Sequence, residues 1–567
     1  MTNGVVQLAI FCAVIVALTP IIGGYMFRVY TGERTFLTPV LAPVERVLYR
    51  LIGVNPDAGQ HWTRYALSML LLHFVGLFVF YMVLRLQDVL PLNPRDVPAF
   101  DPALAFSTAA SFVTNTDWQA YSGETQISYL SQMIAITVQN FLSAGIGMAI
   151  AIAVIRGFVG RQIKTLGNFY VDLTRSVLYI LLPIAIISSI VMVWQGTPQN
   201  FSDYVTAETL EGGKQVIAQG PVASQASIKM LGTNGGGFFN ANNAHPYENP
   251  TPITNFLQLV LVLLIPAGLT YTFGKMAGNT RQGWAIFSAM GVLFVLALVT
   301  VYWAETQGNP LLSNLPIDQA GNMEGKEVRF GVANSALSGN VTTVTSAGAP
   351  NSMHDSFTPI GGFVLLMNIH IGEIIFGGVG SGLFGMMYYV LLTVFLAGLM
   401  VGRSPEYLGK KIEAKEIKLS MLALFTLTIG MIGVPALAII LPSSSSSIQH
   451  AGPHGLSELL YAYGSATGNN GSSFAGFNSG TPFHLTAMGL CMLLGRFGFS
   501  IPILAIAGTL GAKRTALPSA NTFSTHTPLF VGLLIGVIFI IGGLTIFPAL
   551  ALGPLAEFFE MLAGHSF

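Results

Sequence analysis

The chain has 567 residues with 25 basic and 25 acidic side chains, so its formal net charge is zero and no charge balance favours nucleic acid as a partner. Hydrophobic residues make up 52% of the sequence and charged residues only 9%. Soluble proteins are roughly 25% charged, so this composition excludes a water-soluble fold. The two cysteines lie far apart in apolar segments, which favours neither a disulfide framework nor a cysteine metal site.

Ten apolar segments are long enough to cross a bilayer, because a spanning helix needs about 20 mostly apolar residues. In chain order they are residues 4–26, 65–86, 127–156, 174–195, 253–275, 283–304, 384–402, 418–441, 482–511 and 527–550. No basic residue precedes the first, so we expect a retained helix and not a cleaved signal peptide. A further apolar stretch, Phe357–Phe376, runs into a glycine loop and is interpreted as a re-entrant pore helix. The sequence therefore predicts an all-α polytopic membrane protein.

Basic residues fall mainly on one side of these segments. Eighteen Lys and Arg follow the odd-numbered segments, against six on the opposite side. The positive-inside rule places the eighteen in the cytoplasm. The N-terminus and the longer polar loops are then predicted to be external.

Four small, uncharged polar segments lie between apolar ones. Irregular backbone at membrane depth is tolerated only where it is buried in protein or lines a water-filled path. Rings of backbone carbonyls can replace the hydration shell of a monovalent cation, so we interpret the four segments as a filter, with tight helix connections as the alternative. The candidate filter residues are Val113, Thr114, Asn115, Thr116, Thr233, Asn234, Gly235, Gly236, Val379, Gly380, Ser381, Thr467, Gly468, Asn469, Asn470 and Gly471.

The order helix, polar loop, helix recurs four times with one orientation. Internal repeats are common in transport folds, and this pattern predicts four parallel helix–pore loop–helix repeats around a central pore. The predicted repeats span residues 62–158, 172–278, 282–404 and 416–512, with extra transmembrane helices at 1–30 and 525–552. Two external loops, Gly196–Lys229 and Gln307–Asp355, exceed what a pore needs and are interpreted as a folded cap.

Motifs for nucleotide chemistry are missing from the sequence. It has no P-loop and no Asp-Lys-Thr-Gly phosphorylation segment, so we do not expect ATP hydrolysis by this chain. One Gly-x-Gly-x-x-Gly match begins at Gly380, but no strand precedes it and it is weak evidence for a dinucleotide site. His450 and His454 lie in a glycine and proline loop and are interpreted as solvated side chains, not as a metal pair.

Three charged residues lie near the polar segments. Asp117 adjoins the first and Glu373 precedes the third, where each either raises the local cation concentration or forms a helix cap or ion pair. Arg496 lies inside the ninth apolar segment, and a cation there usually faces a cavity or a partner. We favour the interpretation that Arg496 bars cations from passing straight to the cytoplasm, with a structural ion pair as the alternative.

Several longer strings are specific enough to indicate a family. They are residues 114–119, 230–242, 245–250, 376–382, 465–471 and 495–498, and they extend over all four repeats. These strings resemble the potassium-transporting ATPase A chain family, KdpA. Asp117 departs from the family pattern, in which Asn is more common at this position.

The resemblance implies a subunit of a bacterial inner-membrane complex that pumps potassium inward using ATP. It implies that K⁺ binds at the four polar segments, that Gln119 and glycines 235, 380 and 471 are key positions, and that Arg496 is the gate. The implied partners are the P-type ATPase B chain (KdpB), which receives the ion through an intramembrane tunnel, the C chain (KdpC) and often a small F peptide (KdpF). No catalytic residue and no cofactor are expected in this chain. A stand-alone potassium channel of the Trk/Ktr type and a cation symporter remain alternatives.

Overall fold

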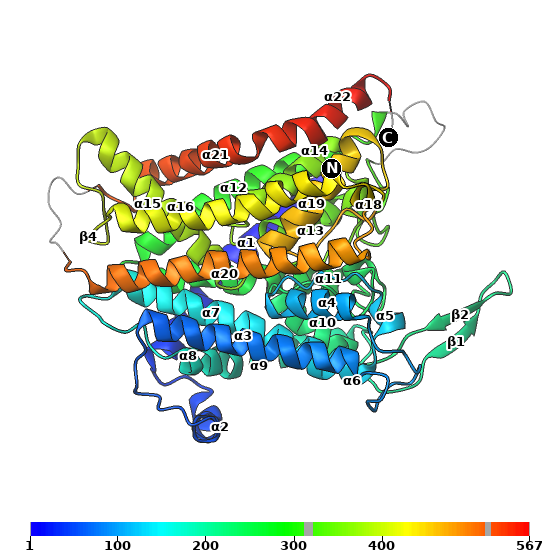
Figure 1. The fold of residues 1–567 in the computed structure, drawn as a ribbon, viewed down its shortest axis with the longest axis horizontal. Coiled ribbons are helices and arrows are strands. Elements are labelled where there is room, and N and C mark those ends of the chain that lie inside the picture. Colours follow the sequence, from blue (N-terminus) through cyan, green and yellow to red (C-terminus); the bar gives the residue numbers. More distant parts are fainter. Residues whose placement is uncertain (1, 311–320, 516–522, 566–567) are drawn as a thin grey trace.

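The computed structural model describes residues 2–310, 321–515 and 523–565, and nearly all of its regular structure is helical (Figure 1). Within these residues ten helical spans are long and apolar enough to cross a membrane: Asn3–Thr31, Trp62–Arg85, Tyr129–Val159, Phe169–Trp194, Pro252–Met276, Thr280–Thr306, Ser381–Val401, Ala414–Ile440, Pro482–Ala512 and Pro528–Leu562. Each contains or overlaps one predicted segment. The predicted all-α polytopic class and its ten spans are confirmed.

Four sets of elements share one order: a long helix, a short helix that ends at a polar loop, and a second helical span. The first two sets are α3 (Trp62–Arg85), α4 (Pro102–Val113) and α6–η1–α7 (Tyr129–Ser131, Gln132–Thr137, Val138–Val159), then α8–η2–α9 (Phe169–Arg175, Ser176–Leu181, Leu182–Trp194), α10 (Val222–Leu231) and α11 (Pro252–Met276). The last two are α12 (Thr280–Thr306), α13 (Gly331–Val344) and α14 with α15 (Pro359–His370, Ser381–Val401), then α16–η6–α17 (Ala414–Thr428, Ile429–Gly433, Val434–Ile440), α19 (Gly452–Gly468) and α20 (Pro482–Ala512).

The third set differs from what the sequence predicted. Its short helix is α13, which lies inside the segment 307–355 that we had interpreted as a cap. Helix α14 has only 12 residues, a length of about 18 Å that cannot cross a hydrocarbon core of about 30 Å. It lies toward the right in Figure 1 and α15 toward the left, with residues 371–380 between them. The re-entrant interpretation of Phe357–Phe376 is therefore wrong, because α14 does not turn back but continues through the break into the long helix α15.

The buried centre of the molecule consists of the second helical span of each set. In the most apolar stretch of Tyr129–Val159, 83% of the residues are buried, against 22% in Trp62–Arg85. Small residues allow the inner helices to meet closely, as at Gly157 of α7, where an added Cβ would collide with Ala507 of α20. Such close approaches of small residues are typical of helix packing in membranes. The outer helices keep apolar side chains on the surface, as lipid-facing helices do.

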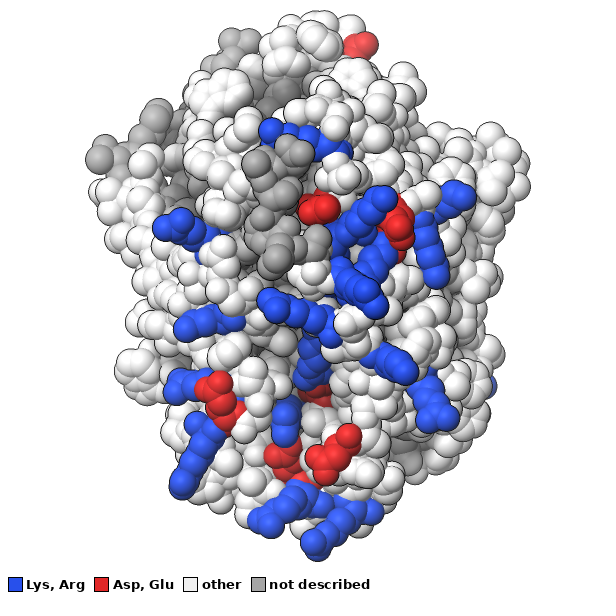
Figure 2. All heavy atoms as spheres, turned by 90° about the vertical axis from the view of Figure 1, so that its left-hand side faces the viewer, with Lys and Arg blue, Asp and Glu red and all other residues white. Residues whose placement is uncertain are grey.

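The two ends of the helical bundle differ in structure and charge. One end carries the antiparallel hairpin β1–β2 (Val205–Glu208, Lys214–Ile217) and the polar loops after the short helices, on the right in Figure 1. Figure 2 shows the opposite end, where Lys and Arg gather and acidic side chains are fewer. We call these the loop end and the basic end. The remaining elements are α1 (Thr2–Thr31), α2 (Thr38–Leu51), α5 (Gly123–Gln126), η3 (Asn242–Ala244), η5 (His354–Ser356), β3 (Glu406–Tyr407), β4 (Lys410–Lys411), α18 (Pro442–Ser445), α21 (Pro528–Leu550), η7 (Ala551–Leu555) and α22 (Ala556–Leu562).

Candidate ion-binding site

Four polar loops, one after each short helix, are hydrogen-bonded to one another in a closed ring. We define the loop ring as residues 114–119, 232–237, 345–348 and 467–472. The first and second loops are joined where Asn115 Nδ2 donates to the Thr233 carbonyl (2.8 Å) and Asn234 Nδ2 donates to Asn115 Oδ1 (2.8 Å). The fourth loop returns to the first through Asn469 Nδ2, which donates to Thr116 Oγ1 (2.9 Å).

The third loop closes the ring through Gly348. Its N–H lies within hydrogen-bond distance of the carbonyls of Asn234 (3.1 Å) and Asn470 (2.7 Å), and its own carbonyl accepts from the Gly236 N–H (3.1 Å). Asn470 Nδ2 also donates to the Thr345 carbonyl (2.8 Å). Asparagine amides and main-chain groups therefore hold all four loops together without any charged group in these bonds.

Glycine is required where the loops touch. A Cβ at Gly235 would lie 2.7 Å from the Gly348 nitrogen, and one at Gly471 would collide with the Thr116 carbonyl. Both glycines have positive φ, +150° and +99°, a region that side chains disfavour. The loops therefore approach each other as bare backbone, which brings carbonyl groups together as cation binding requires.

The segment 378–382 is not part of this ring, which corrects the sequence-based assignment of Val379, Gly380 and Ser381. Gly380 instead packs against Gly147 of α7, where a Cβ would collide with the Gly147 carbonyl. The Val379 N–H donates to Thr233 Oγ1 (2.7 Å), so this segment lies against the ring as a separate layer. Its glycine pattern has a different cause, since positive φ values at Gly372, Gly377 and Gly380 break the span between α14 and α15.

Other predicted filter residues support the loops. Val113 is the last residue of α4 and lies toward Gly76 of α3, and Thr114 Oγ1 is bonded to Thr116 Oγ1 (2.7 Å). Thr467 and Gly468 end α19 and line a small cavity beneath the ring, where the buried Thr467 hydroxyl has no described partner.

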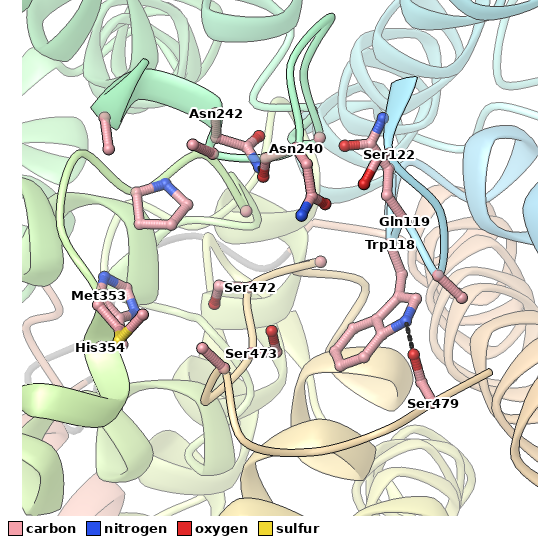
Figure 3. Close-up of a pocket in the computed structure, with 18 of the residues that line it drawn as sticks. Trp118, Gln119, Ser122, Asn240, Asn242, Met353, His354, Ser472, Ser473 and Ser479 are labelled. Carbon is pink, nitrogen blue, oxygen red and sulfur yellow. Dashed lines mark hydrogen bonds between the residues drawn. The ribbon is translucent and has the colours of Figure 1, made fainter. Parts of the chain in front are cut away.

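A cavity of about 820 Å³ opens onto the ring from the loop end (Figure 3). Gln119 lies at its wall and clamps the second loop, with Nε2 donating to the Gly237 carbonyl (2.8 Å) and Oε1 accepting from the Gly237 N–H (3.0 Å). Trp118 points toward Ser479 and donates from Nε1 to its hydroxyl (3.2 Å). We call this cavity the vestibule. Gln119 therefore braces the ring at its mouth.

A buried ion pair behind the second loop escaped the sequence analysis. Lys229 of α10 and Glu248 form a salt bridge, and both side chains are fully buried. Lys229 Nζ also donates to the Gly236 carbonyl (3.1 Å), while Glu248 Oε2 accepts from the Phe239 N–H (3.3 Å). The positive-inside count had treated Lys229 as one residue of an external loop. The sequence did contain a signal for this ion pair, because Lys229 lies only three residues before Gly232, where the second loop begins.

Arg496 lies beneath the ring on α20 and is 6% exposed. It donates from a terminal nitrogen to the Ser143 carbonyl (3.1 Å), and its Nε has no described partner. Among the described residues it forms no ion pair with an acidic side chain, so the structural ion pair considered from the sequence is not found there. The small cavity beside it, about 20 Å³, is lined by residues of three ring loops and of the 378–382 segment, including Asn115, Ser346, Val379, Ser381 and Asn469.

The two acidic residues singled out from the sequence are buried near the ring. Asp117 belongs to the first loop of the ring and also lines the vestibule, and one of its carboxylate oxygens lacks a described partner. Glu373 lies in the break between α14 and α15 and accepts from Ser346 Oγ (2.6 Å) of the third loop. Glu373 therefore joins the segment beneath the ring to the ring itself.

The prediction of two solvated histidines is wrong for His454, and His450 is only partly exposed. His454 is buried and its two ring nitrogens bond Asp355 (2.9 Å) and Glu557 of α22 (3.0 Å). His450 is bonded to the buried Glu458. Burial lowers the pKa of His454, but the bonds to the two carboxylates outweigh it and raise the pKa to about 10. His454 is therefore a charged link between α19, the loop before α14, and the C-terminal helix.

Comparison with known proteins gives the family. The family model of the potassium-transporting ATPase A subunit, KdpA, matches residues 9–559. The chain is 56% identical over 566 residues to the potassium-transporting ATPase potassium-binding subunit of Rhodospirillum centenum, covering 100% of this chain and 99% of that one. It is 57% identical over 565 residues to the protein of that name from Methylobacterium nodulans, with the same coverage. The crystal structure of the potassium transporter TrkH from Vibrio parahaemolyticus aligns with a TM-score of 0.48 and 14% identity over 74% of this chain and 82% of that one. The chain belongs to the potassium-transporting ATPase A subunit family, KdpA.

Proposed function

We propose that this chain is the potassium-binding and translocating subunit of an ATP-driven uptake pump. The observation that carries the proposal is the loop ring, in which four bare-backbone loops meet beneath an open vestibule. K⁺ would lose its water at this ring to main-chain carbonyls and Thr or Asn oxygens. The relatives named potassium-binding subunits support K⁺ as the ion.

The charge asymmetry supports an orientation for uptake. The basic end is cytoplasmic by the positive-inside rule, so the N-terminus, the vestibule and the ring face the outside of a bacterial inner membrane. The ion then enters through the vestibule, which is lined by Asp117, an acidic residue of the ring. The segments 62–158, 172–278, 282–404 and 416–512 are the four pore repeats in this proposal.

Arg496 and the broken span beneath the ring favour lateral delivery over a straight pore. A fixed positive charge in a low-dielectric path repels a cation that has passed the ring. The 371–380 segment also packs across this layer against α7. The ion then leaves sideways, to the P-type ATPase chain of the complex (KdpB), with KdpC and KdpF as further partners. The present chain supplies no catalytic residue and no cofactor.

Copurification and transport test this proposal against a stand-alone channel or symporter. The chain should copurify with a P-type ATPase, show no hydrolysis alone, and be required for potassium-stimulated hydrolysis by the complex. In liposomes the isolated chain should give little potassium flux. Rapid potassium flux from the isolated chain, without an ATPase partner, would instead establish a channel or symporter of the same superfamily.

A further inference from the structure

Helix α2 is an amphipathic helix at the basic end that does not run along the bundle. It spans Thr38–Leu51 and begins with a proline in its first turn. In Figure 1 it lies below the bundle near its left-hand end and runs across the direction of the long helices. If the long helices cross the bilayer, α2 therefore lies along the membrane plane, near one surface.

One face of α2 is tied to the bundle. Glu45 accepts from Arg175 Nε (3.0 Å) of α8 and from the Tyr179 hydroxyl (2.8 Å) of η2, and Tyr49 donates to it as well (2.6 Å). Glu45 and Tyr49 are both buried. The rotation of α2 about its own axis is thus fixed by this polar network, together with the partly buried Leu41, which packs against the core.

A second face is an uncovered apolar stripe. Its members recur at the spacing of one helix face, and Val40 and Leu51 are 70% and 76% exposed. We define the apolar stripe as Val40, Val44, Val47 and Leu51 of α2, together with Phe36, which precedes the helix. Five large apolar side chains on one exposed face are costly in water, so this stripe needs a cover.

The third face is basic. Arg46 and Arg50 are exposed and follow the apolar stripe around the helix, away from Glu45. Within the described residues neither forms an ion pair. The three faces lie about 120° apart on the helical wheel. The Glu45 face contacts protein, the apolar stripe suits an apolar medium, and the basic face suits a negatively charged one.

We propose that α2 is an interfacial helix that binds anionic phospholipid of the leaflet at the basic end. The apolar stripe enters the acyl region, and Arg46 and Arg50 bind lipid phosphates through charge-assisted hydrogen bonds. The arrangement of the faces favours a lipid as the partner. An anionic phospholipid has apolar acyl chains, which match the apolar stripe, and a negatively charged headgroup beside them, which matches the basic face. The proposal depends on the membrane topology alone and not on the ion that the ring binds.

Two measurements on the full chain in nanodiscs test the proposal. In the first, tryptophan replaces Val44 in the stripe or Arg50 on the basic face, and its quenching by brominated phosphatidylcholine is measured after subtracting the signal of the wild type, which has five tryptophans. We expect quenching about twofold stronger for Val44→Trp than for Arg50→Trp, because only the stripe reaches the acyl chains. Equal, weak quenching at both positions would overturn insertion of the stripe.

In the second, native mass spectrometry measures retained phosphatidylglycerol against phosphatidylcholine. Arg46→Gln with Arg50→Gln should weaken phosphatidylglycerol retention about tenfold. Lys275→Gln, in the last turn of α11, combined with Arg281→Gln, in the first turn of α12 at the same end, is the matched control and should retain wild-type binding. Unchanged retention in the first pair, or an equal loss in the control pair, would overturn a specific role of α2. Protection of α2 from hydrogen exchange only with a protein partner present would identify a protein interface and reject the lipid.

Discussion

Two glycine-containing loops of the third repeat, 345–348 and 371–380, lie in successive layers of the molecule. The first joins the loop ring through three hydrogen bonds of Gly348. The second interrupts a span beneath the ring and packs on α7. The first segment closes the ring through its one glycine, whereas the second breaks a helical span where three of its glycines have positive φ.

The comparison shows that the role of a glycine-containing loop depends on the residues that it contacts. In the ring, each loop meets two others, and no acidic or basic side chain takes part in those bonds. In the layer beneath, Glu373 and Arg496 are buried beside the backbone. We infer that ion selection belongs to the upper layer and restriction of passage to the lower one. The predictions that follow separate these two roles.

The largest effect is expected from removing the support behind the ring. Lys229→Met leaves Glu248 as an unpaired buried charge, which costs about 3–5 kcal/mol of stability. Thermal unfolding of the purified protein should show a markedly lower midpoint. Lys229→Met combined with Glu248→Leu should recover part of the loss, and the exposed Lys275→Met should change little. A wild-type midpoint for the single Lys229 variant would contradict the bracing role.

The next effect concerns the lower layer. At an assumed separation of about 6 Å and an effective dielectric near 20, a fixed charge raises the energy of a passing cation by about 3 kcal/mol. This corresponds to roughly a hundredfold in occupancy. Arg496→Met should therefore permit a passive potassium leak and lower uptake per ATP, while Arg496→Lys keeps the barrier. An assembled Arg496→Met complex with unchanged uptake per ATP would reject the barrier.

A smaller effect is expected within the ring. Gly235→Ser places a side chain against the Gly348 backbone and should weaken potassium affinity about tenfold, or 1.4 kcal/mol, with more sodium or rubidium accepted. The amount of protein inserted in the membrane should stay near wild type. Gly433→Ala is the control, because no atom lies within 4 Å of its added Cβ. Unaltered ion affinity and selectivity in the Gly235 variant would refute the ring as the selective layer.

The smallest effect concerns the link at His454, away from both layers. Its pKa in the folded protein is about 10, above the ordinary value near 6.5. The stabilisation is therefore complete below about pH 6.5 and disappears as the pH rises toward 10. Hydrogen exchange of α22 should accelerate over this range in the wild type, and His454→Gln should exchange rapidly throughout. A wild-type exchange rate that is independent of pH, after correction for intrinsic exchange, would contradict the link.

The sequence predicted much of this architecture because apolar length and glycine-rich loops are local signals. It identified all ten spans, three of the four ring loops, and Arg496 as a buried cation. It missed the third loop because α13 is rich in Ser, Thr and Asn and therefore lacks an apolar signal. The glycines that break the span after α14 resemble a filter loop, so the sequence analysis assigned them to the third filter position. The Lys229–Glu248 pair was missed because its partners come together only in the folded chain.

Potassium binding to the purified complex tests the assignment of the third repeat most directly. Isothermal calorimetry with K⁺ and Na⁺ would compare the wild type with Gly348→Ser, in the ring, and Ser381→Ala, in the layer beneath. We predict that Gly348→Ser loses at least about tenfold in potassium affinity, because its Cβ meets the Asn470 carbonyl at 2.5 Å. Ser381→Ala should keep the wild-type preference for K⁺ over Na⁺. Wild-type binding by Gly348→Ser together with lost selectivity in Ser381→Ala would contradict the account.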